Sequence, residues 1–389
     1  MEPKNRFAAS PSSPWTLLGL ILSIVIPSTG VFAKYLGYPG VVVYVLVVSL
    51  VIIVGRRVLF PRLLGWLAGR DLWLAAATFV LLCSLFAVLY PVANSGVVGG
   101  GSDRDDALNI AAGELLHGSY PYYRTTYLGN PISPLPGALL LAVPFVLFGN
   151  SAYQTLFWLI VFFLMLRACL KERPRSLLLL WLALALSPVA LNELITGGDL
   201  LANGLYVLVF IAWFFVVVPR ADLAVWKKLV PTILLGIGLS SRANFAFLLP
   251  LVFAAMARAA GWRRALLYTA ITCFTLGLVT IPFLVYDPRH FSPLYTVGEL
   301  GRFEVILPHA WLVIPLATGL LGLILSFRPG GSDLWALLRR CTVVLAFPVL
   351  CGIVLSSLRA GRPDFGFAFF GVAFLFFGTA GFWEGTRYP

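Results

Sequence analysis

Long apolar runs separated by short polar segments constrain this chain more than any other feature. A helix that crosses a bilayer needs about 20 apolar residues. Candidate runs cover residues 15–33, 40–54, 72–93, 151–170, 176–191, 200–218, 265–285, 311–327, 341–357 and 365–383. They are continuous and do not alternate with polar residues, which excludes a membrane-spanning β-barrel. The sequence therefore predicts an all-α polytopic membrane protein with about ten full transmembrane helices, in one transmembrane domain over residues 1–389.

Composition supports this fold class. Of the 389 residues, 60% are hydrophobic and 11% are charged, whereas a soluble domain has about 25% charged residues. A cytosolic enzyme, a secreted disulfide scaffold and a disordered chain are excluded. The five cysteines lie in or beside apolar runs and show no CxxC spacing, so we expect neither a disulfide framework nor a cysteine metal site.

Two apolar segments do not have the length or continuity of a simple span. Residues 136–148 are too few to cross, so a surface-lying or re-entrant helix is expected there. Residues 229–257 form two short runs around a polar centre that contains Arg242. Basic residues flank the pair on both sides, which predicts a broken hairpin whose tip faces the other side of the membrane.

The distribution of charge predicts the orientation. With the N-terminus in the cytoplasm, most of the 28 Lys and Arg residues fall on the cytoplasmic side and most of the 16 acidic residues fall outside, as the positive-inside rule requires. Both termini are then cytoplasmic. The protein itself is expected in the inner (plasma) membrane of the cell. The two long outer loops cover 94–150, with surface or re-entrant helices, and 286–310. The net charge of +12 thus reflects topology and lipid headgroups, and no nucleic-acid partner is expected.

The first outer loop carries three carboxylates, Asp103, Asp105 and Asp106, after a glycine run. Ser102 or Asp103 is suited to cap an amphipathic surface helix that ends before a glycine. The acids could simply favour the helix dipole. Alternatively, one could act as a general base, or the cluster could hold a divalent cation.

Aromatic and polar residues follow the carboxylates in the same loop. Tyrosines near a membrane surface are often interface anchors, but rings beside amide and guanidinium groups also suit a sugar. The candidates for binding a sugar or an acceptor are His117, Tyr122, Tyr123, Arg124 and Asn130.

Three arginines are candidates for binding a phosphate. Arg242 lies at the tip of the broken hairpin, where a polar residue at membrane depth usually lines a cavity. Arg289 and Arg302 lie in the second outer loop. The short outer segment from Asn192 to Asp199 could complete a site or serve only as a turn.

These features together resemble the GT-C superfamily of integral membrane glycosyltransferases, in particular its polyprenyl-phosphate-sugar-dependent, mannosyltransferase-like branch. The resemblance rests on the acidic cluster, the helix ending in Leu115-Leu116-His117-Gly118, the Tyr120-Pro121-Tyr122 segment and the broken hairpin with its arginine. The detailed match covers residues 99–148. The family's commoner form has a single aspartate followed by an aromatic residue, and this chain departs from it.

The resemblance implies transfer of a sugar from a polyprenyl-phosphate donor to a hydroxyl of a lipid or glycan acceptor, at the outer face and with inversion. It implies that a loop aspartate is the general base, and position places Asp103 first, Asp106 second and Asp105 third. The alternative is a non-catalytic membrane protein: a lipid or sugar-lipid transporter, or a subunit of a larger membrane complex. A polysaccharide ligase or polymerase is a third reading.

Overall fold

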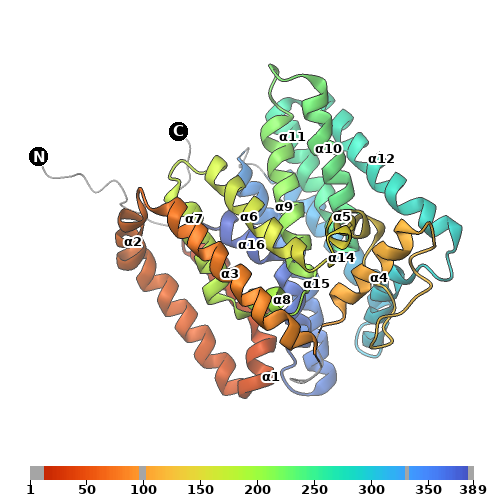
Figure 1. Cartoon of the computed structure of the whole chain (residues 1–389), viewed down its shortest axis with the longest axis horizontal. Helices are drawn as coiled ribbons and strands as arrows, with labels where there is room; N and C mark the ends of the chain where they lie inside the picture. Colours follow the sequence, from red (N-terminus) through yellow and green to blue (C-terminus); the bar gives the residue numbers. More distant parts are fainter. Residues whose placement is uncertain (1–12, 96–101, 329–332, 384–389) are drawn as a thin grey trace, which may run out of the picture.

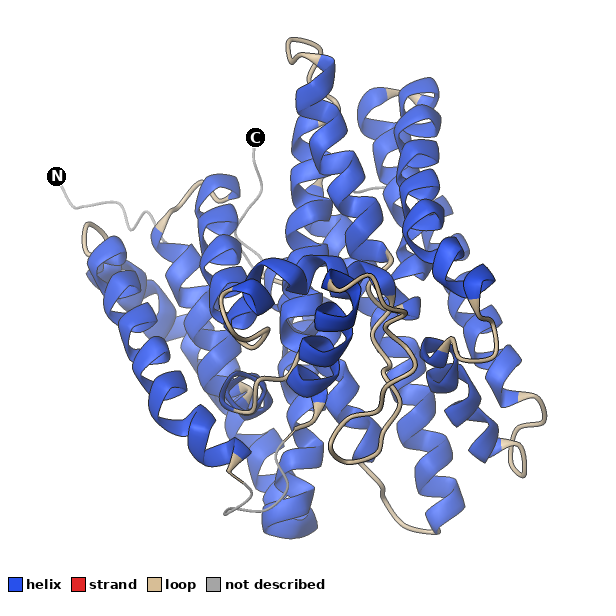
Figure 2. Ribbon diagram, turned by 45° about the vertical axis from the view of Figure 1, so that its right-hand side comes forward, coloured by secondary structure: helices blue, strands red, loops and turns tan. Residues whose placement is uncertain are grey.

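The computed structural model describes residues 13–95, 102–328 and 333–383. Over these residues the chain is helical apart from turns, loops and one isolated bridge between Thr125 and Pro131 (Figures 1 and 2). The helices are α1 (Pro14–Val54), α2 (Phe60–Leu67), α3 (Asp71–Asn94), α4 (Arg104–Leu116), α5 (Pro136–Leu147), α6 (Tyr153–Cys169), α7 (Pro174–Leu186), α8 (Pro188–Ile195), α9 (Leu200–Val217), α10 (Val225–Leu239), α11 (Leu249–Ala260), α12 (Trp262–Tyr286), α13 (Tyr295–Gly298), α14 (Ala310–Phe327), α15 (Leu334–Ala360) and α16 (Val372–Gly381).

The described residues contain seven helices long and apolar enough to cross a membrane, or eight if the bent pair α7 and α8 is one span. The multi-pass helical fold is therefore confirmed, whereas ten full spans are not. Three of the expected spans are short for a crossing. Helix α6 has 17 residues, α7 has 13 before its bend, and α16 with the 3₁₀ turn before it covers only Gly366–Gly381.

The first apolar element is a helical hairpin. Gly37 has φ 67° and ψ −170° and interrupts α1. The Tyr44 hydroxyl donates to the Ile24 carbonyl at 3.2 Å, and the rings of Phe32 and Tyr44 stack at 4.1 Å. Residues 20 apart in a straight helix would lie about 30 Å from each other. The two legs of α1 therefore fold back on each other, which matches the separate runs predicted over 15–33 and 40–54.

The expected span over 176–191 is bent. The axes of α7 and α8 differ by 83°, and the break falls at Ser187, directly before Pro188. Proline cannot donate the hydrogen bond that would continue the helix. The break is held by a bond of 2.9 Å between the hydroxyls of Ser28 and Ser187, and the Val189 amide donates to Ser28 Oγ at 3.2 Å. As a result, α8 leaves the direction of α7 at a steep angle.

The centre of the bundle is α9, of which 78% is buried. The other candidate spans bury only 17–39% of their most apolar window and expose Leu, Val and Phe side chains outward. An apolar outer surface of this kind fits a lipid environment. The helix predicted over 136–148 is α5, and α10 and α11 form the hairpin predicted over 229–257.

The helix expected after the glycine run is α4, which ends at Leu116 before Gly118 with φ +72°. Its apolar face packs on α5 and the intervening loop, through a cluster that includes Leu108, Ala111, Tyr122 and Leu139. The helix is thus anchored on protein, and its first turn lies beside α3 and α8.

Candidate functional site

The three carboxylates at the start of α4 point to two different sides. Asp103 Oδ2 accepts hydrogen bonds from Thr126 Oγ1 at 2.6 Å and from Asn130 Nδ2 at 2.8 Å. Asp106 Oδ2 accepts from the backbone amide of Tyr127 at 2.9 Å. The Asp103 side chain makes no capping hydrogen bond, whereas Ser102 Oγ accepts one from the Arg104 amide at 3.4 Å. These two aspartates therefore hold the loop at 124–131, which includes the sugar candidate Asn130.

Asp105 points the other way, into the protein, and is only 5% exposed. Its Oδ2 accepts from the Tyr90 hydroxyl at 2.5 Å, and Asn150 Nδ2 donates to the same hydroxyl at 2.6 Å. Burial raises the pKa of Asp105 to about 6, although the hydrogen bond from Tyr90 opposes the shift. A carboxyl with a pKa raised in this way exchanges its proton closer to neutral pH than an ordinary aspartate does, which suits acid–base chemistry.

A glycine permits this packing. Gly197 has φ +71°, and a β-carbon at this position would lie 2.7 Å from Tyr90 Cε2 and 3.0 Å from Asp105 Oδ2. The segment from Asn192 to Asp199 therefore closes over the buried acid. Besides forming a turn, that segment packs against Tyr90 and Asp105 through Gly197, and its part in a site stays a prediction.

Arg104 joins the acid cluster to a second buried carboxylate. Its Nη1 lies 3.4 Å from Glu193 Oε1, and the Glu193 side chain is fully buried. Glu193 Oε2 also accepts from the Leu201 amide at 3.2 Å. On its other side, the Arg104 guanidinium lies 4.3 Å from the ring centre of Phe369. Arg104 is therefore held between an acidic and an aromatic group rather than free in solution.

Arg242, at the hairpin tip, is paired with an acid. Its guanidinium forms an ion pair with Asp199, which is fully buried, and Nη1 donates to Ser133 Oγ at 3.2 Å. Asn203 Nδ2 also donates to Asp199 Oδ2, at 3.0 Å. The charge of Arg242 is therefore compensated within the protein. Its proposed contact with a donor phosphate stays a prediction and would need sharing or release of this pair.

The hairpin tip also supports the first outer loop. The amides of Leu135 and Gly137 donate to the carbonyls of Ser241 and Ser240, each at 3.1 Å. A β-carbon on Gly137 would lie 2.2 Å from the Ile237 carbonyl oxygen. The glycine thus allows α5 to approach the tip of α10.

The other two phosphate candidates, Arg289 and Arg302, have partners of their own. Arg302 pairs with Glu299 at 3.1 Å and lies 4.9 Å from the ring centre of Phe367. The amide of Arg289 donates to Asp287 Oδ1 at 3.2 Å. Among the contacts recorded over the described ranges, none joins either residue to Arg242. A single phosphate site made by all three arginines therefore has no support in this structure.

The tyrosines of the first outer loop meet the second outer loop. Tyr122 is buried and donates to the Pro134 carbonyl at 3.1 Å, whereas Tyr123 donates to Asp287 Oδ2 at 3.1 Å. His290 Nδ1 lies 2.8 Å from the same Asp287 oxygen. Burial opposes ionisation, but these hydrogen bonds lower the pKa of Asp287. Only Tyr123 of the two rings is exposed enough to meet a ligand.

The last two predicted sugar contacts lie at the exposed end of α4. Arg124 Nε pairs with Glu114 Oε1 at 3.1 Å. His117 Nδ1 lies 2.7 Å from the Gly113 carbonyl oxygen. Both side chains remain exposed, yet each already has a local partner.

The cation hypothesis for the acid cluster gains no support. Over residues 13–95, 102–328 and 333–383, no three Asp, Glu, His or Cys side chains lie together as metal ligands. The physical reason is that Asp105 points toward α3 while Asp103 and Asp106 point toward the loop.

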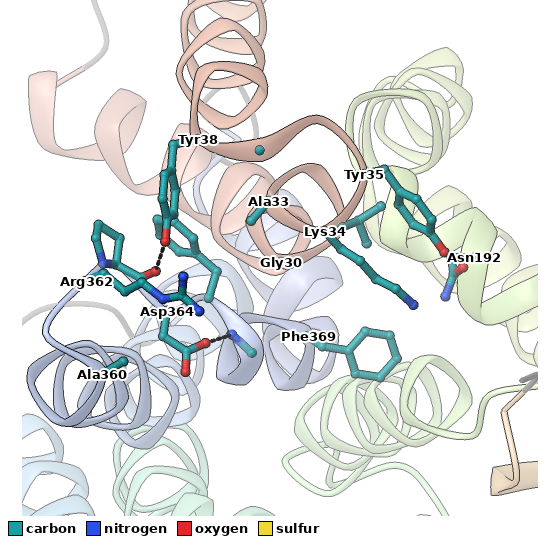
Figure 3. A pocket seen from close by; sticks show the side chains of 15 residues that line it. Gly30, Ala33, Lys34, Tyr35, Tyr38, Asn192, Ala360, Arg362, Asp364 and Phe369 are labelled. Carbon is teal, nitrogen blue, oxygen red and sulfur yellow. Dashed lines mark hydrogen bonds between the residues drawn. The ribbon is translucent and has the colours of Figure 1, made fainter. Parts of the chain in front are cut away.

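A cavity of about 740 Å³, which we call the α1 cavity, lies at the bend of α1. It is lined by the end of the first leg of α1, the loop after α15 and part of α8 (Figure 3). Lys34, Tyr35, Asn192, Arg362 and Phe369 all line it. Phe369 also stacks on Arg104, so the cavity adjoins the Arg104–Glu193 pair.

Sequence reasoning missed Tyr90, Asn150 and the α1 cavity. Tyr90 and Asn150 are polar residues near the ends of apolar helices. That position is the only feature of the sequence that could have indicated a role for them. The cavity needs the approach of segments more than 300 residues apart, for which local patterns carry no signal.

Comparisons with protein-family models, with curated proteins and with solved structures find no match for this chain. The site's own geometry is therefore the basis for any functional statement.

Proposed function

We propose that this protein is a membrane glycosyltransferase of GT-C type. It would move a sugar from a polyprenyl-phosphate donor to a hydroxyl acceptor at the extracytoplasmic face, with inversion. The observation that carries the proposal is Asp105: a buried carboxyl, at the outer end of the bundle, whose pKa is raised to about 6. Strongly perturbed acids of this kind concentrate at functional sites.

The proposed base is Asp105, ahead of Asp103 and Asp106. The latter two carboxylates accept hydrogen bonds that hold the loop at 124–131. Asp105 instead has a proton affinity matched to general base catalysis near neutral pH. Asp105, the third choice from sequence position, is therefore the first choice in this proposal. The Tyr90 hydroxyl, 2.5 Å from Asp105 Oδ2, marks the position that an acceptor hydroxyl would take.

The proposed reaction is a single displacement. The acceptor oxygen attacks the anomeric carbon of the donor sugar while its proton passes to Asp105. The bond between that carbon and the phosphate oxygen breaks, and the lipid phosphate leaves with the electron pair. The attack from the opposite side inverts the anomeric configuration. Cations beside the leaving group would stabilise its growing charge.

The test is sugar transfer by the purified protein in lipid nanodiscs, with a panel of labelled polyprenyl-phosphate sugars. In Asp105→Asn, turnover should fall by about 10²–10⁴-fold, because the amide cannot accept the proton. Donor binding should persist, since the amide keeps the size of the side chain.

The matched controls are Asp103→Asn and Asp106→Asn, which carry the same chemical change on the same helix turn. We expect them to raise the KM for the acceptor more than they lower kcat, because they loosen the loop. Wild-type turnover in Asp105→Asn would refute the base assignment. Binding of the lipid-linked sugar without any product would instead favour a transporter or a non-catalytic subunit.

A further inference from the structure

The α1 cavity contains cationic side chains that the proposed chemistry does not use. We propose that it binds the phosphate of an anionic lipid headgroup through Lys34 and Arg362. The two residues reach the cavity from opposite sides, one from α1 and one from the loop after α15 (Figure 3). They are 328 residues apart in the chain, so only the fold brings them to one space.

The single acid that lines the cavity, Asp364, is hydrogen-bonded within its own turn. Asp364 Oδ2 accepts a hydrogen bond from the Ser356 hydroxyl, and Oδ1 accepts from the Gly366 amide at 2.9 Å. The bond from Ser356, followed by that from Gly366, lowers the pKa of Asp364, so this side chain is ionised and committed to its own turn. The charge of Arg362 also contributes to the lowered pKa of Asp364. The lining still carries two cationic groups against one carboxylate, and guanidinium and ammonium groups both bind phosphate well.

The remaining walls suit a headgroup with polar and apolar parts. Asn192 supplies an amide beside the Lys34 side chain, which extends toward it and Phe369 (Figure 3). The Tyr38 hydroxyl is engaged with the Pro363 carbonyl at 2.8 Å and fixes the loop to α1. A volume of about 740 Å³ lies within the range of small-molecule sites, about 300–1,000 Å³.

The position of the cavity favours a lipid as the source of the phosphate. The bend of α1 lies at the same end of the molecule as α8, opposite α2 (Figure 1). Beside it, the apolar side chains of Tyr35 and Leu36 are 69% and 63% exposed. An acyl or prenyl chain could lie along this apolar face while its phosphate meets Lys34. A free phosphate would use the same two cations but gain nothing from that face.

The experiment is equilibrium binding of radiolabelled farnesyl phosphate to the full chain in detergent, with farnesol and inorganic phosphate as competitors. We expect Lys34→Gln and Arg362→Gln each to weaken the affinity about tenfold, as expected for loss of one charge-assisted contact. Farnesol should compete poorly, because it lacks the phosphate. Competition by millimolar inorganic phosphate as strong as that by unlabelled farnesyl phosphate would support the cation pair but assign a free phosphate as its ligand.

The chain offers matched controls. Lys227 lies 5.4 Å from the Trp226 ring, as Lys34 lies 5.2 Å from the Tyr35 ring. Lys227→Gln therefore removes an equivalent lysine elsewhere, and Arg359→Gln removes an arginine from the same helix end outside the cavity lining. Both should bind farnesyl phosphate as the unsubstituted chain does. Unchanged affinity in both cavity variants, or equal binding of farnesol, would overturn the proposal.

This inference does not depend on sugar transfer. Asp105→Asn should bind farnesyl phosphate normally even if it abolishes turnover. Loss of binding in the cavity variants together with full activity of Asp105→Asn would uphold the cavity and refute the proposed base.

Discussion

At the scale of single residues, burial separates carboxylates that look equivalent in the sequence. Asp105 lies 5% exposed against Tyr90, whereas Asp103 and Asp106 bind the loop at 124–131. Asp105 points away from Asp103, because residues three apart share a helix face and residues two apart do not. The sequence could not indicate which side would be dry, because Tyr90 and Gly197 come from other helices.

The hydrogen bond from Tyr90 gives a prediction about pH. This bond lowers the pKa of Asp105, so Tyr90→Phe should raise that pKa further above its value of about 6. A base works only when it is deprotonated, and the acidic limb of the profile of kcat/KM against pH should therefore move to higher pH. Turnover near pH 6 should fall severalfold, while turnover near pH 8 should change little.

Sugar transfer measured from pH 5 to pH 9 tests this expectation. Tyr268→Phe provides the control, because it removes a buried tyrosine hydroxyl from α12, away from Asp105. An unmoved or acid-shifted limb in Tyr90→Phe would show that Asp105 is not the titrating base.

The buried ion pair of Arg242 and Asp199 gives a second prediction. Removing one partner leaves a buried charge without compensation, which typically costs about 3–5 kcal/mol. We expect Arg242→Gln to lose stability of this size in thermal or denaturant unfolding in detergent. The double variant Arg242→Gln with Asp199→Asn should recover most of the loss, since no charge is then left unpaired.

An exposed pair serves as the comparison. Arg124 pairs with Glu114 and its side chain is 68% exposed, so Arg124→Gln should cost less than about 1 kcal/mol. If the double variant were no more stable than Arg242→Gln, the coupling between the two charges would be disproved. A normal fold with weaker donor binding in Arg242→Gln would favour the phosphate role predicted from the sequence.

At the scale of elements, breaks in apolar helices shape one end of the molecule. Gly37 reverses α1, Ser187 and Pro188 bend α7 into α8, and Ser240 to Arg242 separate α10 from α11. Each break brings polar groups to one end of the bundle. The hairpin at Arg242 was predictable from its polar centre and basic flanks, whereas the 83° bend at Ser187 was not, because its support comes from Ser28 on another helix.

Gly37 carries the prediction at this scale. Its backbone, with φ 67° and ψ −170°, lies in a region that is essentially restricted to glycine. Space is not the constraint, because the nearest atom to an added β-carbon is 3.7 Å away. Gly37→Ala should therefore destabilise the chain by about 1–3 kcal/mol through backbone strain and should weaken farnesyl phosphate binding next to Lys34.

Gly65 is the matched glycine. It lies in α2 with nothing within 4 Å of an added β-carbon, and alanine is favoured over glycine there by up to about 1 kcal/mol. Gly65→Ala should leave the unfolding temperature unchanged or raise it slightly. Equal unfolding temperatures of the two variants would mean that the bend at Gly37 tolerates an L-residue without backbone strain.

At the scale of the whole molecule, the arrangement of charge predicts sidedness. The first and last described residues lie near α2 and α16. Helix α8 and the bend of α1 lie at the opposite end of the molecule (Figure 1). The sequence places the α4 end outside the cell membrane by the positive-inside rule. The helical bundle agrees with a multi-pass protein, and the side of each end stays a prediction.

Cysteine labelling tests that sidedness. Ser119 is exposed next to the end of α4, so Ser119→Cys should react with an impermeant maleimide on intact cells. Asp222 is exposed between α9 and α10, so Asp222→Cys should react only after lysis. The unsubstituted chain, with its five native cysteines, gives the background. Labelling of Asp222→Cys but not of Ser119→Cys on intact cells would show the opposite topology and would refute the functional proposal.

The sequence by itself determined the helical membrane fold, the hairpin at 229–257, the short α5 and the helix that begins at the acid cluster. Each depends on a local pattern, since a helix satisfies its backbone hydrogen bonds within one segment and the membrane requires that it do so. Tertiary structure alone decided that Asp105 is the buried acid, that Arg242 meets Asp199 and that Lys34 shares a cavity with Arg362. Burial and charge pairing depend on which distant segments pack together, and a desolvated group's pKa follows from that packing rather than from its neighbours in sequence.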